Sequence, residues 1–272
     1  MTSFDDKNPI KRILGAYQRD LTNYVDEFLP VSFRDIPGLA PAFEERARQI
    51  ASRMILRVVQ VNARSWREAA RRTMQGRKIY EALLGDLRGP VGRGVEQIIA
   101  QNAQLISSIP DKLRVETSRY ALEQYARGTR SEEVAKQVKR RFPQLAKARV
   151  DLIARTEVSK ASTAITKARS EDIGISIYQW STSEDARVRL SHRLMDKVIV
   201  YWSDAPSPEA LVGEKSSLGH YHAGDCPNCR CTPLPVVDLR EIAWPARMYA
   251  GGRIQRVTLA QFKRLNSLPI AA

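Results

Sequence analysis

Apolar residues recur at every third or fourth position through much of the first 170 residues, and this spacing predicts a succession of amphipathic helices. The clearest helix is expected over residues 41–73, where Pro41 stands in the first turn and Gly76 follows the end. Its apolar face carries Phe43, Ala47, Ile50, Met54, Val58 and Val61. Further helices are expected over residues 78–86, 92–107, 110–127, 131–141 and 144–171.

The pattern changes after Gly174, where apolar and polar positions alternate as they do in β-strands. Strands are expected over residues 175–181, 198–202 and 232–237. A turn or helix cap is expected at Ser183–Asp185, leading into a short helix that carries Arg187, Arg189 and His192. We therefore expect an α+β fold that is predominantly α. A long helical N-terminal region would precede a small α+β module with a Cys/His cluster and an extended C-terminal tail.

These elements suggest three parts of the chain. Residues 1–109 would form a helical docking region and residues 110–237 a compact module, in which helices over 110–171 precede an α+β part over 175–237. Residues 238–272 are basic, contain two adjacent glycines and lack a long periodicity. We expect them to form an extended tail that becomes ordered only on a partner.

The adjacent helices at 131–141 and 144–171 have a superficial similarity to a helix-turn-helix motif and are rich in Lys and Arg. Phe142 and Pro143 leave almost no turn between them, however, and the second helix is far longer than a recognition helix. Binding in a DNA groove is therefore not favoured.

Composition narrows the class of protein. No apolar run approaches the roughly 18 residues that a membrane span needs, and the first residues lack the features of a signal peptide. We expect no membrane partner and synthesis in a reducing cytoplasm. The net charge of +14 favours polyanions or acidic protein surfaces as neighbours, although a basic surface can also serve only for solubility.

Part of this charge forms a stripe on one face of the 41–73 helix. At 100° per residue its members fall within about 40° of one another, roughly 80° from the apolar face. One interpretation is a solvated face whose long stems cover apolar surface. The other is a surface that contacts DNA phosphates or an acidic partner protein. The stripe consists of Arg46, Arg53, Arg57, Arg64 and Arg71.

Every cysteine and every histidine of the chain lies between residues 192 and 231. Thiolate and imidazole groups are the usual ligands of zinc, and a two-residue spacing between cysteines lets both bind one ion. Metal ligands are therefore expected among His192, Cys226, Cys229 and Cys231, with His220 and His222 less favoured. Buried free thiols and a packed histidine are the alternative.

Other chemistries fit less well. A redox-active Cys-x-x-Cys pair needs a helix after the first cysteine, whereas Pro233 and Pro235 follow this one closely. The chain has no H-E-x-x-H, G-x-S-x-G or G-x-G-x-x-G motif and no complete phosphate-binding loop. Asp185, Arg189 and His192 would share a helical face, which we interpret as an ion-paired cap beside a structural histidine. We expect no catalytic residues.

Several short motifs follow one another between residues 100 and 237. As an ordered set they resemble the phage head-morphogenesis family, the minor head proteins similar to protein F of phage Mu. His192, Cys229 and Cys231 match the family's histidine and C-x-C positions, whereas Cys226, His220 and His222 lie where members vary. The residues that carry the resemblance are Arg155, Thr156 and Glu157, then Ala161, Ala164 and Ala168, then Trp180 and Ser181, then Asp185, Arg187, Val188, Arg189 and His192, and finally Cys229, Arg230 and Cys231.

The resemblance implies a structural virion protein that acts in head assembly and is not an enzyme. Portal protein, major capsid protein and packaged DNA, bound without sequence specificity, would be its partners. Its place would be the head interior or the portal vertex, after assembly in the host cytoplasm. Any zinc would be structural. The rival hypotheses are a metal-dependent hydrolase or nuclease and a zinc-containing nucleic-acid-binding regulator.

Overall fold

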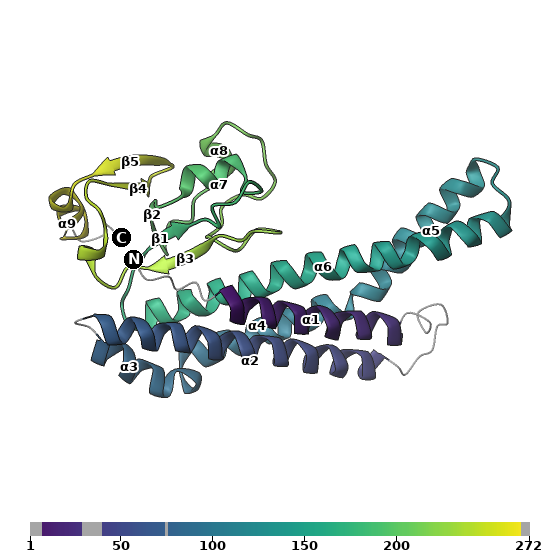
Figure 1. Ribbon diagram of the computed structural model, residues 1–272, viewed down its shortest axis with the longest axis horizontal. Coiled ribbons are helices and arrows are strands. Elements are labelled where there is room, and N and C mark those ends of the chain that lie inside the picture. Colours follow the sequence, from purple (N-terminus) through teal and green to yellow (C-terminus); the bar gives the residue numbers. More distant parts are fainter. Residues whose placement is uncertain (1–6, 29–39, 74–75, 268–272) are drawn as a thin grey trace. The chain divides into compact units, whose positions relative to one another are not determined.

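Helices make up most of the chain, and a small mixed sheet forms in its C-terminal part (Figure 1). The computed structural model describes residues 7–28, 40–73 and 76–267. Within them no helix combines the length and apolarity needed to cross a membrane. The long helices are α1 (Lys7–Phe28), α2 (Ala40–Arg72), α3 (Gly76–Gly85), α4 (Pro90–Ser107), α5 (Ile109–Ala126) and α6 (Ser131–Asp172), with a 3-10 turn η1 (Asp86–Arg88).

The chain divides into two compact units. The helical unit contains Lys7–Gln60 and Val95–Val158, and the sheet unit contains Val61–Gly94 and Ser159–Ala272. The predicted fold class, α+β and predominantly α with a Cys/His cluster, is confirmed.

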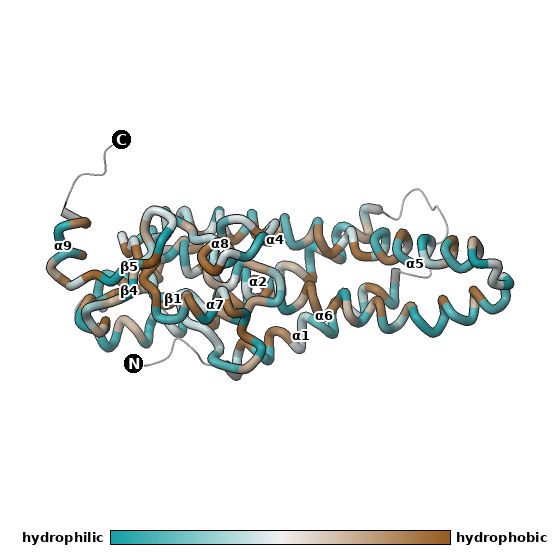
Figure 2. Tube along the Cα trace, turned by 90° about the horizontal axis from the view of Figure 1, so that it is seen from above, coloured by the Kyte–Doolittle hydropathy of each residue, from teal (hydrophilic) through white to brown (hydrophobic). Residues whose placement is uncertain are grey.

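In the helical unit, α1 and the first half of α2 lie side by side (Figure 1). Hydrophobic positions recur along the helices between hydrophilic ones (Figure 2). Such a pattern gives each helix an apolar face that can pack against a neighbour. On α1 these positions are Ile13, Tyr17, Leu21, Tyr24 and Val25, all buried.

A polar network lies inside this apolar core. The hydroxyl of Tyr17 donates to Asn102 Oδ1 at 2.6 Å, and Asn102 Nδ2 donates to Glu157 Oε2 at 3.0 Å. Buried polar groups stabilise a fold only when they are hydrogen-bonded. The network therefore ties α1, α4 and α6 together at one register.

The predicted break between two helices at Phe142 and Pro143 is wrong. One helix, α6, runs from Ser131 to Asp172 with Pro143 inside it. Proline in a helix interior costs about 3 kcal/mol because it removes one hydrogen bond and crowds the preceding turn. Pro143 is exposed, so its ring displaces no packed neighbour. Val134 and Val150 are buried on either side of it, which favours continuing the helix.

The sheet unit holds five strands in the order β3-β1-β2-β4-β5. Strand β2 pairs with β4 in parallel and the other neighbours are antiparallel. The strands are β1 (Ile177–Ser181), β2 (Ile199–Tyr201), β3 (Thr232–Pro235), β4 (Ala246–Ala250) and β5 (Arg253–Val257), accompanied by α7 (Leu190–Met195), α8 (Pro208–Leu211), the 3-10 turn η2 (Leu239–Glu241) and α9 (Leu259–Ser267).

Alternation along β1 sends its side chains to two different cores, as the period of a strand requires. Ile177 joins an apolar cluster with Ile199, Met248 and Phe262. The next residue, Tyr178, instead joins a cluster that includes all three cysteines. The Cys/His segment therefore covers one face of the sheet.

The expected extended tail over 238–272 is corrected for the residues that the structure describes, since residues 239–267 form η2, β4, β5 and α9. Gly251 and Gly252 have φ values of 58° and 79° and join β4 to β5. Adjacent residues with positive φ make a tight hairpin turn, a role for which glycine is well suited. Met248 and Phe262 also complete an apolar cluster of the sheet unit. Residues 268–272 lie outside the described residues.

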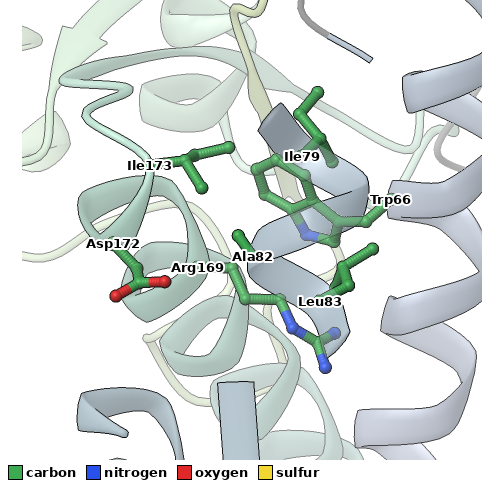
Figure 3. Close-up of a pocket in the computed structure, with 7 residues that line it drawn as sticks. All are labelled: Trp66, Ile79, Ala82, Leu83, Arg169, Asp172 and Ile173. Carbon is green, nitrogen blue, oxygen red and sulfur yellow. The ribbon is translucent and has the colours of Figure 1, made fainter. Parts of the chain in front are cut away.

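A pocket in the sheet unit lies between the end of α2, α3 and the end of α6 (Figure 3). The volume open to a water-sized sphere is about 10 Å³, which is room for about one water molecule. This pocket is too small to hold a substrate. It is lined by Trp66, Ile79, Ala82, Leu83, Arg169, Asp172 and Ile173.

Candidate metal centre

Three of the predicted ligands converge in the sheet unit. One donor atom from each of His192, Cys229 and Cys231 lies within 4.8 Å of the other two, and all three residues are buried. His192 comes from α7, Cys231 directly precedes β3, and Cys229 lies in the loop before it. The sulfur atoms of Cys229 and Cys231 are 3.6 and 3.3 Å from His192 Nδ1.

A tight turn presents these sulfur atoms. Pro227 and Asn228 occupy its centre, Asn228 has a φ of 58°, and the amide of Cys229 donates to the carbonyl of Cys226 at 3.1 Å. Proline followed by a residue with positive φ is typical of a type II turn. The amide of Cys231 then donates to the Sγ of Cys229 at 3.4 Å, which fixes the position of that sulfur within the turn.

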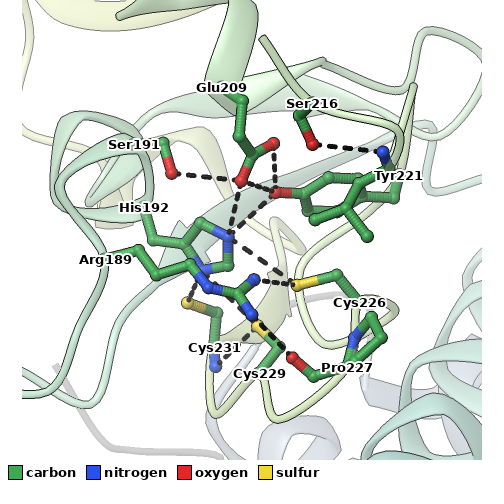
Figure 4. Close-up of polar contacts among 11 residues, drawn as sticks. Arg189, Ser191, His192, Glu209, Ser216, Tyr221, Cys226, Pro227, Cys229 and Cys231 are labelled. Atoms are coloured by element: carbon green, nitrogen blue, oxygen red, sulfur yellow. Dashed lines mark hydrogen bonds and ion pairs between the residues drawn. The ribbon is translucent and has the colours of Figure 1, made fainter. Parts of the chain in front are cut away.

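The orientation of the His192 ring is set from its other side (Figure 4). Nε2 lies 2.9 Å from the hydroxyl of Tyr221, and that hydroxyl donates to the carboxylate of Glu209 at 2.8 Å. Glu209 is buried and also accepts from Ser191 Oγ at 3.2 Å. Because the single hydroxyl proton of Tyr221 goes to Glu209, Nε2 must be the N–H donor. When the ring is neutral, the lone pair of Nδ1 therefore faces the two cysteines.

Cys226 lies on a different side of the ring. Its Sγ is 3.8 Å from Nε2 and accepts from Arg189 at 3.0 Å, while Arg189 also donates to the carbonyl of Pro227 (Figure 4). Contact with the thiol of Cys229 and burial raise the pKa of Cys226. Burial lowers the pKa of His192, but the contacts with Cys226 and Cys229 outweigh it and raise the value to about 9. The Cys226 thiol and the His192 ring therefore both hold their protons more tightly than they would in water.

The loop that carries the cysteines is fixed to α6. Thr163 Oγ1 donates to the carbonyl of Ala223 at 2.7 Å. Gly224 follows with a φ of 93°, and a Cβ atom there would stand 2.4 Å from Thr163 Oγ1. Only glycine allows so close an approach with a positive φ.

The two less favoured histidines lie apart from this group. His220 is exposed, and its Nδ1 lies 2.8 Å from the carbonyl oxygen of Ala205. His222 is buried beside aromatic rings, with Nδ1 3.2 Å from the hydroxyl of Tyr178 and its ring edge-on to Trp202.

The buried position of His222 predicts a pH dependence of stability. Burial, aided by the charge of Lys167, lowers its pKa to about 4 from an unfolded value of about 6.5. Between these values the unfolded chain binds a proton that the folded chain does not, so stability falls as pH falls from about 6.5 to 4. Relative to His222→Gln, the wild type should lose about 2–3 kcal/mol of unfolding free energy over this window.

Urea unfolding of both proteins at several pH values measures this difference. Asp225, whose pKa burial raises to about 6, has the opposite dependence but is present in both proteins and cancels. His220→Gln, at an exposed histidine, is the matched control and should follow the wild type. Parallel profiles of wild type and His222→Gln would contradict the prediction.

A family comparison bears on the same residues. Residues 119–234 match the model of the family described as Phage Mu protein F like protein. The match covers less than half of the chain and shows a similarity to this family over those residues. This confirms the resemblance seen in the sequence motifs.

Two proteins show where the similarity extends. The chain is 33% identical over 147 residues to an uncharacterized protein of Haemophilus influenzae, covering 54% of this chain and 30% of that protein. It is 34% identical over 110 residues to the minor head protein GP7 of Bacillus phage SPP1, covering 39% of this chain and 35% of that protein. The chain thus spans about a third of the length of these relatives. No solved structure gives a significant match.

Within the matched residues, several motif residues support the Cys/His group. The carboxylate of Asp185 pairs with the guanidinium of Arg230, beside Cys229 and Cys231. Hydrogen bonds from Arg230 and from the amide of Arg187 hold the pKa of Asp185 well below its usual range. Asp185 thus stabilises a turn, and the helix expected to carry Arg187 and Arg189 is corrected, because α7 begins only at Leu190.

The other motif residues lie in the core or on α6. Trp180 is fully buried against the ring of His192. Thr156 is buried on α6, Glu157 accepts from Asn102, and Arg155 is exposed.

Sequence reasoning missed Tyr221, Glu209 and Ser191, although Tyr221 stands between two histidines that were considered. No sequence pattern indicated Glu209, because its hydrogen bonds with Tyr221 and Ser191 depend on α8 lying against α7. The contacts between these two helices exist only in the folded chain.

The arginine stripe on α2 separates into two groups. Arg46 and Arg53 reach acids of α1, Glu27 at 3.8 Å and Asp20 at 3.3 Å. Such exposed pairs are worth about 0–1 kcal/mol. The remaining members, Arg57, Arg64 and Arg71, are exposed.

Proposed function

We propose that this chain is a structural minor head protein of a tailed bacteriophage. The observation that carries the proposal is the match of residues 119–234 to the Phage Mu protein F like family, together with the similarity to a protein named as a minor head protein. The chain would be a virion component, in the head interior or at the portal vertex, assembled in the host cytoplasm. Portal protein and major capsid protein are the proposed partners, with packaged DNA as a nonspecific neighbour.

The burial of the candidate site supports a structural role over a catalytic one. His192 is only 3% exposed, and Cys229 and Cys231 are similarly buried. A phosphodiester of DNA could not reach these atoms without unfolding the loop that covers them. We therefore favour a module that holds its shape over a hydrolase or nuclease.

The exposed arginines of α2 supply a docking surface for this role. Arg57, Arg64 and Arg71 are seven residues apart, so they project from one side of the helix. Like charges held in register attract an anionic partner and speed its association. An acidic face of a portal or capsid protein fits this surface.

The proposal is tested in a phage that encodes this chain. Mass spectrometry of purified heads should find the chain, and a tagged copy should retain the portal or major capsid protein on affinity resin. Heads that assemble without the chain, or cleavage of DNA by the purified protein with divalent metals, would contradict it.

Reversal of the exposed stripe, Arg57→Glu, Arg64→Glu and Arg71→Glu together, should weaken retention of the partner about tenfold, because the attraction becomes repulsion. The matched control is Arg48→Glu, Arg93→Glu and Arg127→Glu, which makes the same charge change at other exposed positions. Circular dichroism checks that both variants fold. Equal retention by both variants would remove α2 as the docking surface, and loss of DNA binding alone would assign the stripe to DNA.

A further inference from the structure

We propose that the sheet unit binds one zinc ion through Nδ1 of His192 and the sulfur atoms of Cys226, Cys229 and Cys231, and that Tyr221 and Glu209 are positioning residues that hold the histidine ring for the metal. The proposal is independent of the proposed function, because its test measures metal and not assembly.

The spacing of the donor atoms fits a tetrahedral ion. With zinc–sulfur and zinc–nitrogen bonds of about 2.3 and 2.0–2.1 Å, a nitrogen and a sulfur on the same ion are about 3.6 Å apart. The sulfur atoms of Cys229 and Cys231 lie 3.6 and 3.3 Å from Nδ1. Little movement is needed for these three atoms to share one ion.

The surroundings prepare the histidine to be a ligand. A histidine that binds zinc usually donates its other N–H to a carboxylate or another oxygen, which fixes the tautomer and the ring orientation. Here Nε2 donates to Tyr221, which donates to Glu209, while Ser191 donates to the same carboxylate. When the ring is neutral, this relay leaves the Nδ1 lone pair aimed at two sulfur atoms.

Cys226 is assigned the fourth position because it stands in the same turn as Cys229 and contacts the same ring, but its sulfur lies 3.8 Å from Nε2 and must turn toward Nδ1 to reach the ion. Zinc binding would release the thiol protons and the Nδ1 proton of the protonated imidazole to solvent and leave three thiolates and a neutral imidazole around a dication, a net charge of −1. The guanidinium of Arg189, 3.0 Å from the sulfur of Cys226, would neutralise that charge. Zinc is the metal of choice because thiolate and imidazole ligands in a closed, buried site are typical of structural zinc.

The experiment uses the purified full chain under reducing conditions. The protein is stripped with a chelator, titrated with Zn²⁺, and titrated separately with Co²⁺, whose absorption reports tetrahedral geometry and bound thiolate. We expect one ion per chain and an intense sulfur-to-cobalt band. Failure of the folded wild type to take up one equivalent of either metal would overturn the proposal.

Variants separate the ligands from the positioning residues. Cys226→Ser should lower the sulfur-to-cobalt band by about a third, since one of three thiolates is lost. Tyr221→Phe and Glu209→Gln should keep the band but weaken the affinity about 10–100-fold. His220→Ala, at an exposed histidine, is the matched control and should change neither.

Two results would overturn parts of the assignment. An unchanged cobalt spectrum in Cys226→Ser would remove Cys226 as a ligand, and unchanged affinity in both Tyr221→Phe and Glu209→Gln would remove the relay. If Cys226→Ser fails to fold, X-ray absorption of the zinc-loaded wild type still counts its sulfur neighbours. Three sulfur atoms and one nitrogen would support the site, and any other set would overturn it.

Discussion

Trp180→Ala is expected to lower the free energy of unfolding of the sheet unit by about 3–5 kcal/mol, the usual cost of deleting a fully buried tryptophan. Trp180 is 0% exposed, and its ring lies edge-on to His192 with centroids 5.6 Å apart. Removing it leaves a cavity between β1 and the Cys/His group, so the ring that holds the histidine is lost together with apolar burial.

Trp180→Phe is the matched control. It keeps an aromatic ring, and it removes an indole N–H that has no hydrogen-bond partner within the described part of the chain. Its cost should be about 1–2 kcal/mol, for the smaller volume alone. Urea unfolding followed by circular dichroism measures both variants. Equal losses in the two would show that the size of the ring is not what the site requires.

Gly224→Ala is expected to cost about 2–5 kcal/mol, from two separate effects. A φ of 93° is unfavourable for any residue with a Cβ atom, at about 1–2 kcal/mol. The new methyl group would also stand 2.4 Å from Thr163 Oγ1 and 3.0 Å from Ser159 Oγ, and overpacking of this kind costs about 1–3 kcal/mol. The loop with the cysteines would have to move away from α6.

Gly219→Ala isolates the first effect. Its φ of 66° is also positive, but nothing lies within 4 Å of the added Cβ atom. It should therefore cost only about 1–2 kcal/mol, the backbone contribution. Thermal or urea unfolding of both variants gives the difference. If Gly224→Ala were no worse than Gly219→Ala, the close contact with α6 would carry no stability.

Much of the fold could be predicted because apolar spacing reports the helices directly. The helix expected over 41–73 is found at Ala40–Arg72, since its buried positions recur at helical spacing. The break at Pro143 could not be judged from local sequence, because burial on both sides offsets the cost of the proline. The β4–β5 hairpin was missed because its short strands have no periodic pattern of their own. They are defined by pairing, β4 with β2 and β5 with β4.

The candidate site, like the fold, could be predicted from the sequence only in part. His192, Cys229 and Cys231 could be selected because thiol and imidazole groups gather in one short segment. Glu209 could not be assigned, and the contact of Arg189 with Cys226 could not be foreseen, because their partners are more than ten residues away and only the packing of α7, α8 and the loop brings them together.

The order of the strands has a consequence for where the module ends. The family match stops at residue 234, yet β4 and β5 continue the same sheet beyond it. A fragment cut at that limit would leave β2, with its buried Ile199 and Val200, as an open edge strand. Unpaired backbone beside exposed apolar side chains is a template for aggregation. A fragment that keeps β2 paired within the sheet must therefore extend beyond the family match, at least through Val257.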